Sequence, residues 1–281
     1  MVRSLILILF FFSSELYALV PPALTTYDEL AEEAENVEAE DINSSYWLIV
    51  IGIEEYDETD AVVFSTRSTN AFTIAAQRRL GISKRRSMNL VGDRATSGRI
   101  KDNMTQILQR VQPGDTIFFY YSGHGIPDIK TNEPYLLPKD KLPETVVRDD
   151  FFKLKNIYAQ LSASKASKVV AFVDSCFSGS TDNKSLFHGV AAARLQPKQV
   201  SVDRSKMVVI SAGTGEQFSN MYKEKRHRLF TYYLTKGLIK GKSDIKSLYH
   251  YIKENVEETS FELGESYLQS PTIEGDLQIV F

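Results

Sequence analysis

The segment Lys168–Gly179 reads KVVAFVDSCFSG, an uninterrupted apolar run that ends in small polar residues around a cysteine. A run of this kind, rich in Val and Phe, is typical of a strand that is buried on both faces of a parallel sheet. The segment Thr116–Gly125, TIFFYYSGHG, has the same pattern and ends around a histidine. Because parallel neighbouring strands end at the same edge of a sheet, Cys176 and His124 are expected to lie side by side there.

The chain on either side of these segments alternates apolar strand patterns with amphipathic helix patterns. Further strands are expected at 46–51, 88–91 and 207–211, helices at 69–80, 97–111, 150–162, 229–239 and 244–257, and an edge strand at 277–281. Strands and helices that alternate with short connections favour parallel pairing through right-handed crossovers. The predicted fold is therefore an open α/β sandwich.

The composition is that of a globular protein, with 43% apolar and 25% charged residues in 281. The charge is unevenly distributed, because residues 19–44 contain eight acids and no Lys or Arg. The whole chain carries −3 and residues 1–18 are neutral, which leaves +5 for residues 45–281. So small a positive charge, with no basic run interleaved with aromatic residues, predicts no nucleic-acid partner.

The N-terminus has the pattern of a signal peptide. One basic residue precedes an apolar run, Leu5–Phe12, and a possible cleavage site follows at Ala18. The run is shorter than the roughly 20 residues that span a bilayer, so we expect an exported protein, periplasmic or secreted, with no stable membrane span. An uncleaved anchor is the alternative interpretation. Residues 19–44 are expected to form a mobile acidic linker or pro-segment, and 45–281 the folded domain.

Cys176 is the only cysteine, so the chain has no internal disulfide. A lone thiol in an oxidising compartment is a liability unless it is buried or chemically used. The imidazole of His124 could take the thiol proton and return it to a leaving amine, which makes Cys176 a candidate nucleophile. The flanking glycines would let a substrate backbone approach, and the N–H groups of Gly125 and Cys176 are candidates for an oxyanion hole. The alternative for Cys176 is an ordinary buried thiol.

These motifs resemble those of the caspase-like cysteine peptidases, in particular the bacterial and metacaspase-type branch. Ser122–Gly125 is similar to the histidine motif of that superfamily and Asp174–Gly179 to its cysteine motif, and the 52 residues between His124 and Cys176 agree with the usual spacing of about 50. Other similar segments are Tyr46–Tyr56, Pro134–Pro138, Ser211–Glu216, Leu229–Leu234 and Gln269–Pro271. The resemblance covers about residues 46–275. It implies a caspase-like three-layer sandwich with a mostly parallel sheet of about six strands, and a cysteine endopeptidase that works through an acyl-enzyme.

The resemblance also implies a substrate pocket. In metacaspase-type members, the Asp two residues before the nucleophile binds the Arg or Lys that precedes the cut, and Asp174 stands at that position. Ser122 is assigned to the same pocket. The second acid that such members carry at the start of the first helix is missing here, and Arg67 in that region could oppose Asp174. A preference for basic residues is expected; the alternative is that Asp174 only caps a local turn.

No metal or cofactor is predicted. Calcium is a trait of many metacaspases, and Asp149–Asp150 is similar to one of their acidic pairs, but only Asp182 lies near the second acidic position, so calcium activation is left open. His188, His227 and His250 lack the spacing of metal ligands. His227 belongs to a basic patch, residues 223–228, that is expected to be a solvated loop.

Two functions from different classes remain open: an active endopeptidase, or a catalytically inactive caspase-like domain that binds or regulates other proteins. The intact cysteine and histidine favour the first. The loop 180–206 contains several Lys and Arg residues, so an enzyme with a basic preference could process itself there. The acidic leader could shield the active-site groove or be trimmed on activation.

Overall fold

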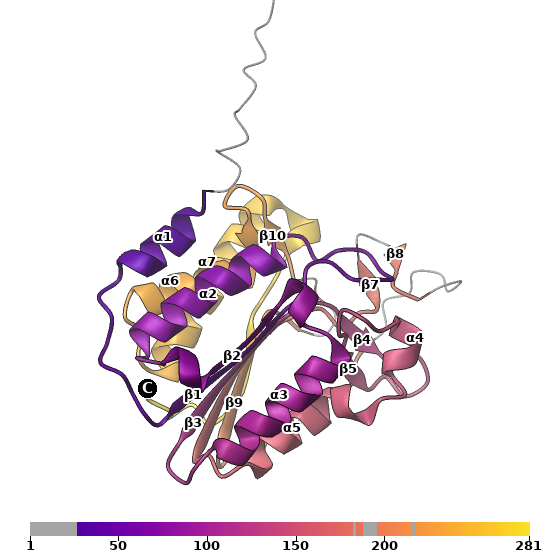
Figure 1. The fold of residues 1–281 in the computed structure, drawn as a ribbon. Helices are drawn as coiled ribbons and strands as arrows, with labels where there is room; N and C mark the ends of the chain where they lie inside the picture. The colour runs from indigo at the N-terminus through magenta and orange to yellow at the C-terminus, as the bar shows by residue number, and fades with distance from the viewer. Residues whose placement is uncertain (1–26, 182–183, 188–195, 215–216, 218) are drawn as a thin grey trace, which may run out of the picture.

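The computed structural model describes residues 27–281 except 182–183, 188–195, 215–216 and 218. The predicted signal peptide, 1–18, lies outside the described residues and stays a prediction. Within the described part of the chain, a six-stranded sheet is covered by helices on both faces (Figure 1). None of the helices described is long and apolar enough to cross a membrane.

The sheet confirms the predicted fold class and its mostly parallel pairing. Its strands are β1 (Tyr46–Gly52), β2 (Ser87–Val91), β3 (Thr116–Ser122), β6 (Lys168–Asp174), β9 (Met207–Ser211) and β12 (Thr272–Gly275). Their spatial order is β12-β9-β6-β3-β1-β2, with β12 antiparallel to β9 and all other pairs parallel. The two strands that precede Cys176 and His124, β6 and β3, are therefore direct neighbours at the centre of the sheet.

The central strands are apolar throughout because helices cover both of their faces. All seven residues of β3 are buried. In β1, Ile49 and Ile51 face one core cluster whereas Leu48 and Val50 face the other, as the two-residue period of a strand requires. The uninterrupted apolar run thus results from two alternating apolar faces.

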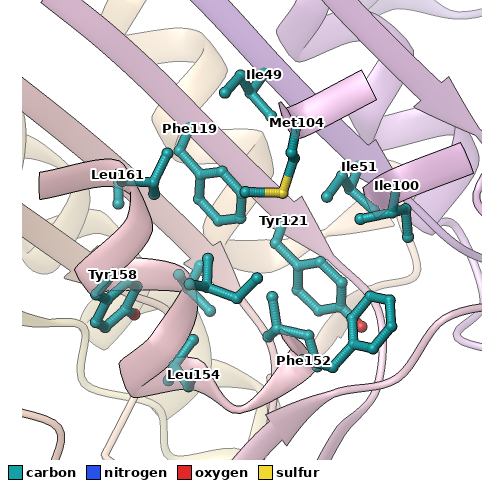
Figure 2. Packing of buried hydrophobic residues seen from close by; sticks show 14 of the residues in the cluster. Ile49, Ile51, Ile100, Met104, Phe119, Tyr121, Phe152, Leu154, Tyr158 and Leu161 are labelled. Carbon is teal, nitrogen blue, oxygen red and sulfur yellow. The ribbon is translucent and has the colours of Figure 1, made fainter. Parts of the chain in front are cut away.

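The helices form the two outer layers. On one face lie α3 (Ser97–Arg110) and α5 (Leu154–Ala163), and on the other α1 (Glu29–Asn36), α2 (Ser65–Arg79), α6 (Leu229–Ile239) and α7 (Ile245–Leu263). Figure 2 shows the first face, where Met104 of α3 and Leu161 of α5 pack around Phe119 and Tyr121 of β3. The three layers agree with the predicted sandwich.

Short elements decorate the loops at the edges of the sheet. They are β4 (Gly125–Pro127) with β5 (Pro134–Leu136), β7 (Ser180–Thr181) with β8 (Lys184–Ser185), β10 (Met221–Tyr222) with β11 (His227–Arg228), the helix α4 (Pro143–Val146), and the single 3₁₀ turns η2 (Lys84–Arg86), η3 (Gly92–Arg94), η4 (Asp150–Phe152) and η5 (Glu265–Tyr267). Each of the strand pairs is antiparallel.

The edge strand predicted at 277–281 is wrong. The edge of the sheet is β12, and the chain turns away from it at Gly275, which has a φ of +117°. Ile279 is buried instead, and the ring of Phe281 packs edge-on against Phe118 with centroids 5.5 Å apart. The apolar residues of the tail therefore close the base of the core and do not extend the sheet.

The acidic stretch expected to be a mobile linker contains a helix, α1, that is docked on the domain. Asp28 caps it by accepting a hydrogen bond from the N–H of Ala31 at 3.1 Å. Leu30 and Ala34 are buried between α1 and its neighbours α2 and α6. The sequence pattern underestimated this segment because two apolar residues are enough to dock a helix when its acids are also paired.

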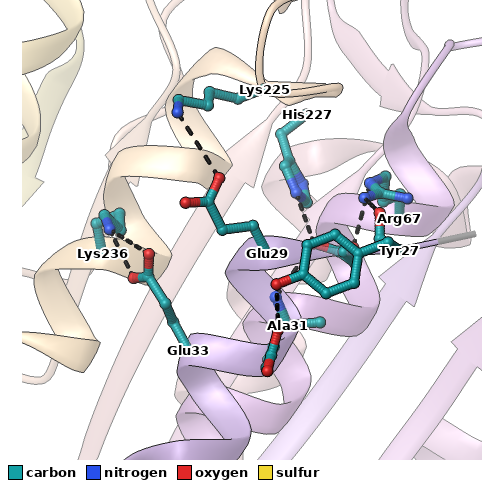
Figure 3. A network of polar contacts seen from close by, with 10 residues as sticks. Tyr27, Glu29, Ala31, Glu33, Arg67, Lys225, His227 and Lys236 are labelled. Atoms are coloured by element: carbon teal, nitrogen blue, oxygen red, sulfur yellow. Dashed lines mark hydrogen bonds and ion pairs between the residues drawn. The ribbon is translucent and has the colours of Figure 1, made fainter. Parts of the chain in front are cut away.

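Those acids pair with bases from distant parts of the chain (Figure 3). Asp28 lies 3.2 Å from Nε of Arg67 and 3.0 Å from Nε2 of His227. Glu33 contacts Nζ of Lys236 at 2.6 Å, and Glu29 contacts Lys225 at 3.7 Å. The leader is thus an electrostatic counterpart to the basic body, as the charge distribution suggested.

Acid should release α1. Burial raises the pKa of Asp28, but the hydrogen bond and charge of His227 together with Arg67 outweigh it, so the pKa lies below the ordinary value of 3.8. A lowered carboxyl pKa stabilises the docked state fully above pH 3.8, and that stabilisation is lost as the pH falls through the lowered value. Hydrogen exchange is expected to show protected α1 amides at pH 5 and early loss of their protection below pH 3.8, before β3 opens. Simultaneous loss in both elements would contradict this.

Candidate active site

The site forms where β3 and β6 end, because their parallel register aligns Ser122 with Asp174. Hydrogen bonds continue the pairing beyond both strands. The N–H of Gly123 donates to the carbonyl of Asp174 at 3.4 Å, and the Ser175 hydroxyl donates to the carbonyl of Gly123 at 2.9 Å. The two polar segments therefore run on side by side, and the structure brings the His124 and Cys176 loops together at one sheet edge.

The glycine after His124 is required by contact between the two loops. A Cβ atom on Gly125 would lie 2.4 Å from the ring of Phe177 and 2.7 Å from the carbonyl oxygen of Cys176. The N–H of Gly125, expected to line an oxyanion hole, donates to that same carbonyl at 3.2 Å. This donor is occupied in the conformation described, and its place in an oxyanion hole stays a prediction. The glycine permits loop packing here, where the sequence suggested room for a substrate.

His124 is held in place by its backbone and by one ring nitrogen. Its N–H donates to the hydroxyl of Tyr56 at 2.7 Å, and its carbonyl accepts from the hydroxyl of Tyr121 at 2.6 Å. The ring nitrogen Nε2 lies 2.8 Å from the carbonyl oxygen of Asp60. Because a carbonyl oxygen can only accept, Nε2 carries the proton of the neutral ring and Nδ1 is the nitrogen left with a free lone pair.

Cys176 is partly exposed, unlike His124, which is only 5% exposed. Its Sγ lies 3.0 Å from Oγ of Ser178. Within the described residues, the thiol makes no hydrogen bond to the ring of His124, and the N–H of Cys176 donates to no acceptor. The thiol of Cys176 therefore points to its own loop in this conformation. The backbone N–H of Cys176 has no acceptor among the described residues.

Asp174 and Ser122, predicted to contact substrate, are both fully buried. One carboxylate oxygen of Asp174 accepts from the hydroxyl of Ser219, and the other accepts from the hydroxyl of Thr231 and from its N–H at 3.2 Å. The hydroxyl of Ser65 donates to Oγ of Ser122 at 2.8 Å. Neither side chain offers exposed surface to a ligand in this conformation.

The cation near Asp174 is Arg228, and Arg67 lies elsewhere in a pair with Asp28. Arg228 donates from Nη2 to the carbonyl of Ser219 and, at 3.1 Å, to its hydroxyl, which in turn donates to Asp174. The basic patch 223–228 was expected to be solvated, yet His227 is 1% and Arg228 7% exposed. The expectation failed because β11 buries both side chains, His227 against Ser68 and Arg228 against Ser219.

The family that matches this sequence agrees with the resemblance that the motifs indicated. The caspase domain family matches residues 46–280 of the sequence. The chain belongs to the caspase domain family. No curated protein sequence matches it significantly.

Two solved structures are similar to this caspase domain. A protein from Geobacter sulfurreducens has a TM-score of 0.57 and 19% sequence identity, over 84% of this chain and 97% of that chain. The Drosophila initiator caspase Dronc has a TM-score of 0.51 and 10% identity, over 85% of this chain and 84% of that chain. At these identities the likeness concerns the fold. The metacaspase-type branch stays a prediction.

The acids considered for calcium are engaged by the caspase domain itself. Asp149 contacts Nζ of Lys101 at 2.7 Å, and Asp150 lies 3.7 Å from Nζ of Lys153. Among the residues that the structure describes, no three His, Cys, Asp or Glu side chains are grouped to hold a metal ion. Asp182 and His188 lie outside the described residues.

The sequence missed five residues that shape the site: Tyr56, Asp60, Ser219, Arg228 and Thr231. Asp60 acts through its backbone carbonyl, for which no side-chain pattern exists. Tyr56 ends the segment noted for its similarity to the first strand, and its ring lies 4.8 Å from that of His124. The last three come from the segment around β10, β11 and the first turn of α6. Ser219 and Thr231 donate to Asp174, which is 45 and 57 residues away, and Arg228 donates to Ser219.

The buried ring of His124 resists protonation. Burial is the main cause and the nearby charge of Arg228 adds to it, so that the pKa of His124 falls to about 4, although the carbonyl of Asp60 opposes the shift. The imidazole is therefore neutral, and able to accept a proton, at any pH above about 4.

The acid limb of the rate profile should reflect this pKa. We expect kcat/KM for a fluorogenic peptide to be sustained below pH 6 and to fall near pH 4, since a general base must be unprotonated to act. His250→Ala, which removes an exposed histidine, should leave the profile unchanged. Circular dichroism at each pH separates this limb from unfolding. A limb near pH 6.5, the ordinary histidine value, would contradict the assignment.

Proposed function

We propose that this caspase domain is a cysteine endopeptidase in which Cys176 is the nucleophile and His124 the base. The observation that carries the proposal is the hydrogen bond from Nε2 of His124 to the Asp60 carbonyl, 2.8 Å, at the sheet edge where the partly exposed thiol lies. It leaves Nδ1 as the acceptor for the thiol proton. The thiolate attacks the peptide carbonyl, Nδ1–H protonates the leaving amine, and water hydrolyses the acyl-enzyme.

Two local movements complete this mechanism. Sγ turns from Ser178 toward His124, and the Gly125 N–H leaves the carbonyl of Cys176 to join the uncommitted Cys176 N–H as an oxyanion hole. Each donor of such a hole contributes about 3 kcal/mol to transition-state stabilisation. Peptide binding between the two loops would displace the Gly125 contact. These changes involve a rotamer and one peptide unit, and they leave β3 and β6 in place.

The same proposal includes cleavage after Arg or Lys, with Asp174 as the acid of the pocket and Ser122 beside it. A carboxylate is the group that pairs with either base. The reaction needs no cofactor, because a thiol and an imidazole supply both nucleophile and base. The signal pattern at 1–18 supports export to the periplasm or the cell exterior.

A labelling and cleavage experiment tests the active site. Wild-type protein should react with a peptidyl thiol reagent and release fluorophore from Arg or Lys peptides. Cys176→Ala should abolish both. His124→Ala should lower kcat/KM on the order of 10³-fold, because the loss of one residue of a catalytic unit removes most of the rate enhancement of the whole unit. His250→Ala is the matched histidine control and should retain wild-type rates.

Other outcomes have distinct meanings. Labelling and cleavage that persist in Cys176→Ala would reject the nucleophile. A folded wild type that is neither labelled nor active on any peptide would favour the inactive, protein-binding alternative. Preferential cleavage after Asp would leave the dyad intact and overturn the basic preference.

Self-processing is a further part of the proposal. The loop 180–206 contains Lys198, Arg204 and Lys206 among its bases, and Arg204 is exposed, pairing only at 3.4 Å with Glu274. We expect purified wild-type protein to develop two fragments over hours while Cys176→Ala stays intact, and Arg204→Gln to shift or slow the cut. Mass spectrometry of the fragments identifies the site, and identical band patterns for wild type and Cys176→Ala would exclude self-processing.

A further inference from the structure

Arg228 is a buried cation that the proposed mechanism does not use. Only 7% of it is exposed, and within the described residues its Nε has no hydrogen-bond partner. Nη2 donates twice to Ser219, whose hydroxyl donates to Asp174. Its charge also reaches the ring of His124 and the phenol of Tyr56. The guanidinium is thus linked to the acid of the pocket through Ser219, and its charge acts on the base of the site.

In the conformation described, Asp174 offers no exposed surface to a substrate cation. The carboxylate is fully buried and accepts three hydrogen bonds from Ser219 and Thr231. A second cation beside Arg228 would meet like-charge repulsion in a medium that screens poorly. The hydrogen-bonding positions of Asp174 are thus taken by residues of the chain itself, and a basic substrate side chain has to displace them.

The backbone of Arg228 is fixed from the far side by α1. The N–H of Arg228 donates to the hydroxyl of Ser68 at 2.8 Å, and that hydroxyl lies 3.2 Å from Nδ1 of His227. Nε2 of His227 meets Asp28 at the start of α1, 3.0 Å away (Figure 3). A continuous polar chain therefore joins the acidic leader to Arg228, which binds the Asp174 partner Ser219.

We propose that Arg228 is the specificity-determining residue of the Asp174 pocket: it limits the access of basic side chains to Asp174, and α1 holds it in place through Asp28, His227 and Ser68. The inference rests on the proposed function for the identity of the pocket. Without the Arg228 side chain, the like-charge repulsion is removed, and a substrate guanidinium can approach the carboxylate more closely. The pocket then takes Arg or Lys more readily.

Binding can be measured without catalysis. In the Cys176→Ala background, calorimetry compares acetyl-arginine N-methylamide with its uncharged norleucine counterpart. Adding Arg228→Ala should tighten binding of the arginine ligand at least about tenfold, the effect of a newly formed charge-assisted contact, and leave the norleucine ligand unchanged. Adding Lys223→Ala instead removes an exposed charge from the same hairpin and should change neither. Arg228→Gln, which keeps the length of the side chain, gives the same test if the alanine variant is unstable.

Activity gives the second readout. With Cys176 intact, Arg228→Ala should raise kcat/KM for Arg and Lys peptides about tenfold through a lower KM, with an unchanged rate of alkylation by iodoacetamide. Asp28→Asn, which weakens the anchor and leaves the pocket intact, should give a smaller increase in the same direction. Lys223→Ala should match wild type.

Three results would overturn the inference: equal arginine-ligand binding with and without Arg228, weaker binding when Arg228 is removed, or a glutamate ligand that binds Cys176→Ala and is lost on adding Arg228→Ala. The third result would mean that Arg228 binds an anionic side chain of the substrate. Failure of the proposed function looks different: ligand binding would follow the expected pattern while no Cys176-containing variant cleaves any peptide.

Discussion

The parallel pairing of β3 with β6 is the constraint on which the rest of the site depends. Its register sets Ser122 opposite Asp174, and the segments of His124 and Cys176 then leave the sheet together. A shift of one residue would exchange the side chains that face the two helix layers and would move Ser122 out of line with Asp174. The two apolar layers that pack on β3 and β6 therefore also fix where Cys176 and His124 emerge.

Beyond the strands, the loops hold each other by close backbone contact. Gly125 lies so near Phe177 that only a residue without a Cβ fits, and its N–H closes the contact. Hydrogen bonds to Tyr56, Tyr121 and the Asp60 carbonyl hold the backbone and the ring of His124 in place. The thiol of Cys176, in contrast, is partly exposed. The site thus combines a firmly held imidazole with a partly exposed thiol.

Local patterns predicted the parts of this domain that depend on local periodicity. The five parallel strands follow from apolar runs, and the helices α2, α3, α6 and α7 from their helical patterns, each within a few residues at its start. The failures involve distant partners. The helix α1 docks because Asp28 meets His227, 199 residues away, and Arg228 is buried because its backbone binds Ser68, 160 residues away. The tail resembled a strand because burial against Phe118 demands the same apolar residues as an edge strand.

The pocket of Asp174 shows why a motif alone does not define specificity. A carboxylate and a guanidinium that are both removed from water need each other or an equivalent set of donors and acceptors. Here the donors of Ser219 and Thr231 satisfy the acid, while the unpartnered Nε of Arg228 leaves the cation incompletely satisfied. Arg228 is therefore held less firmly by hydrogen bonds than Asp174, and its position depends on contacts outside the pocket. Because those contacts pass through His227 to Asp28, the stability of α1 and the accessibility of Asp174 are coupled, and any event that detaches the acidic leader changes what the pocket can bind.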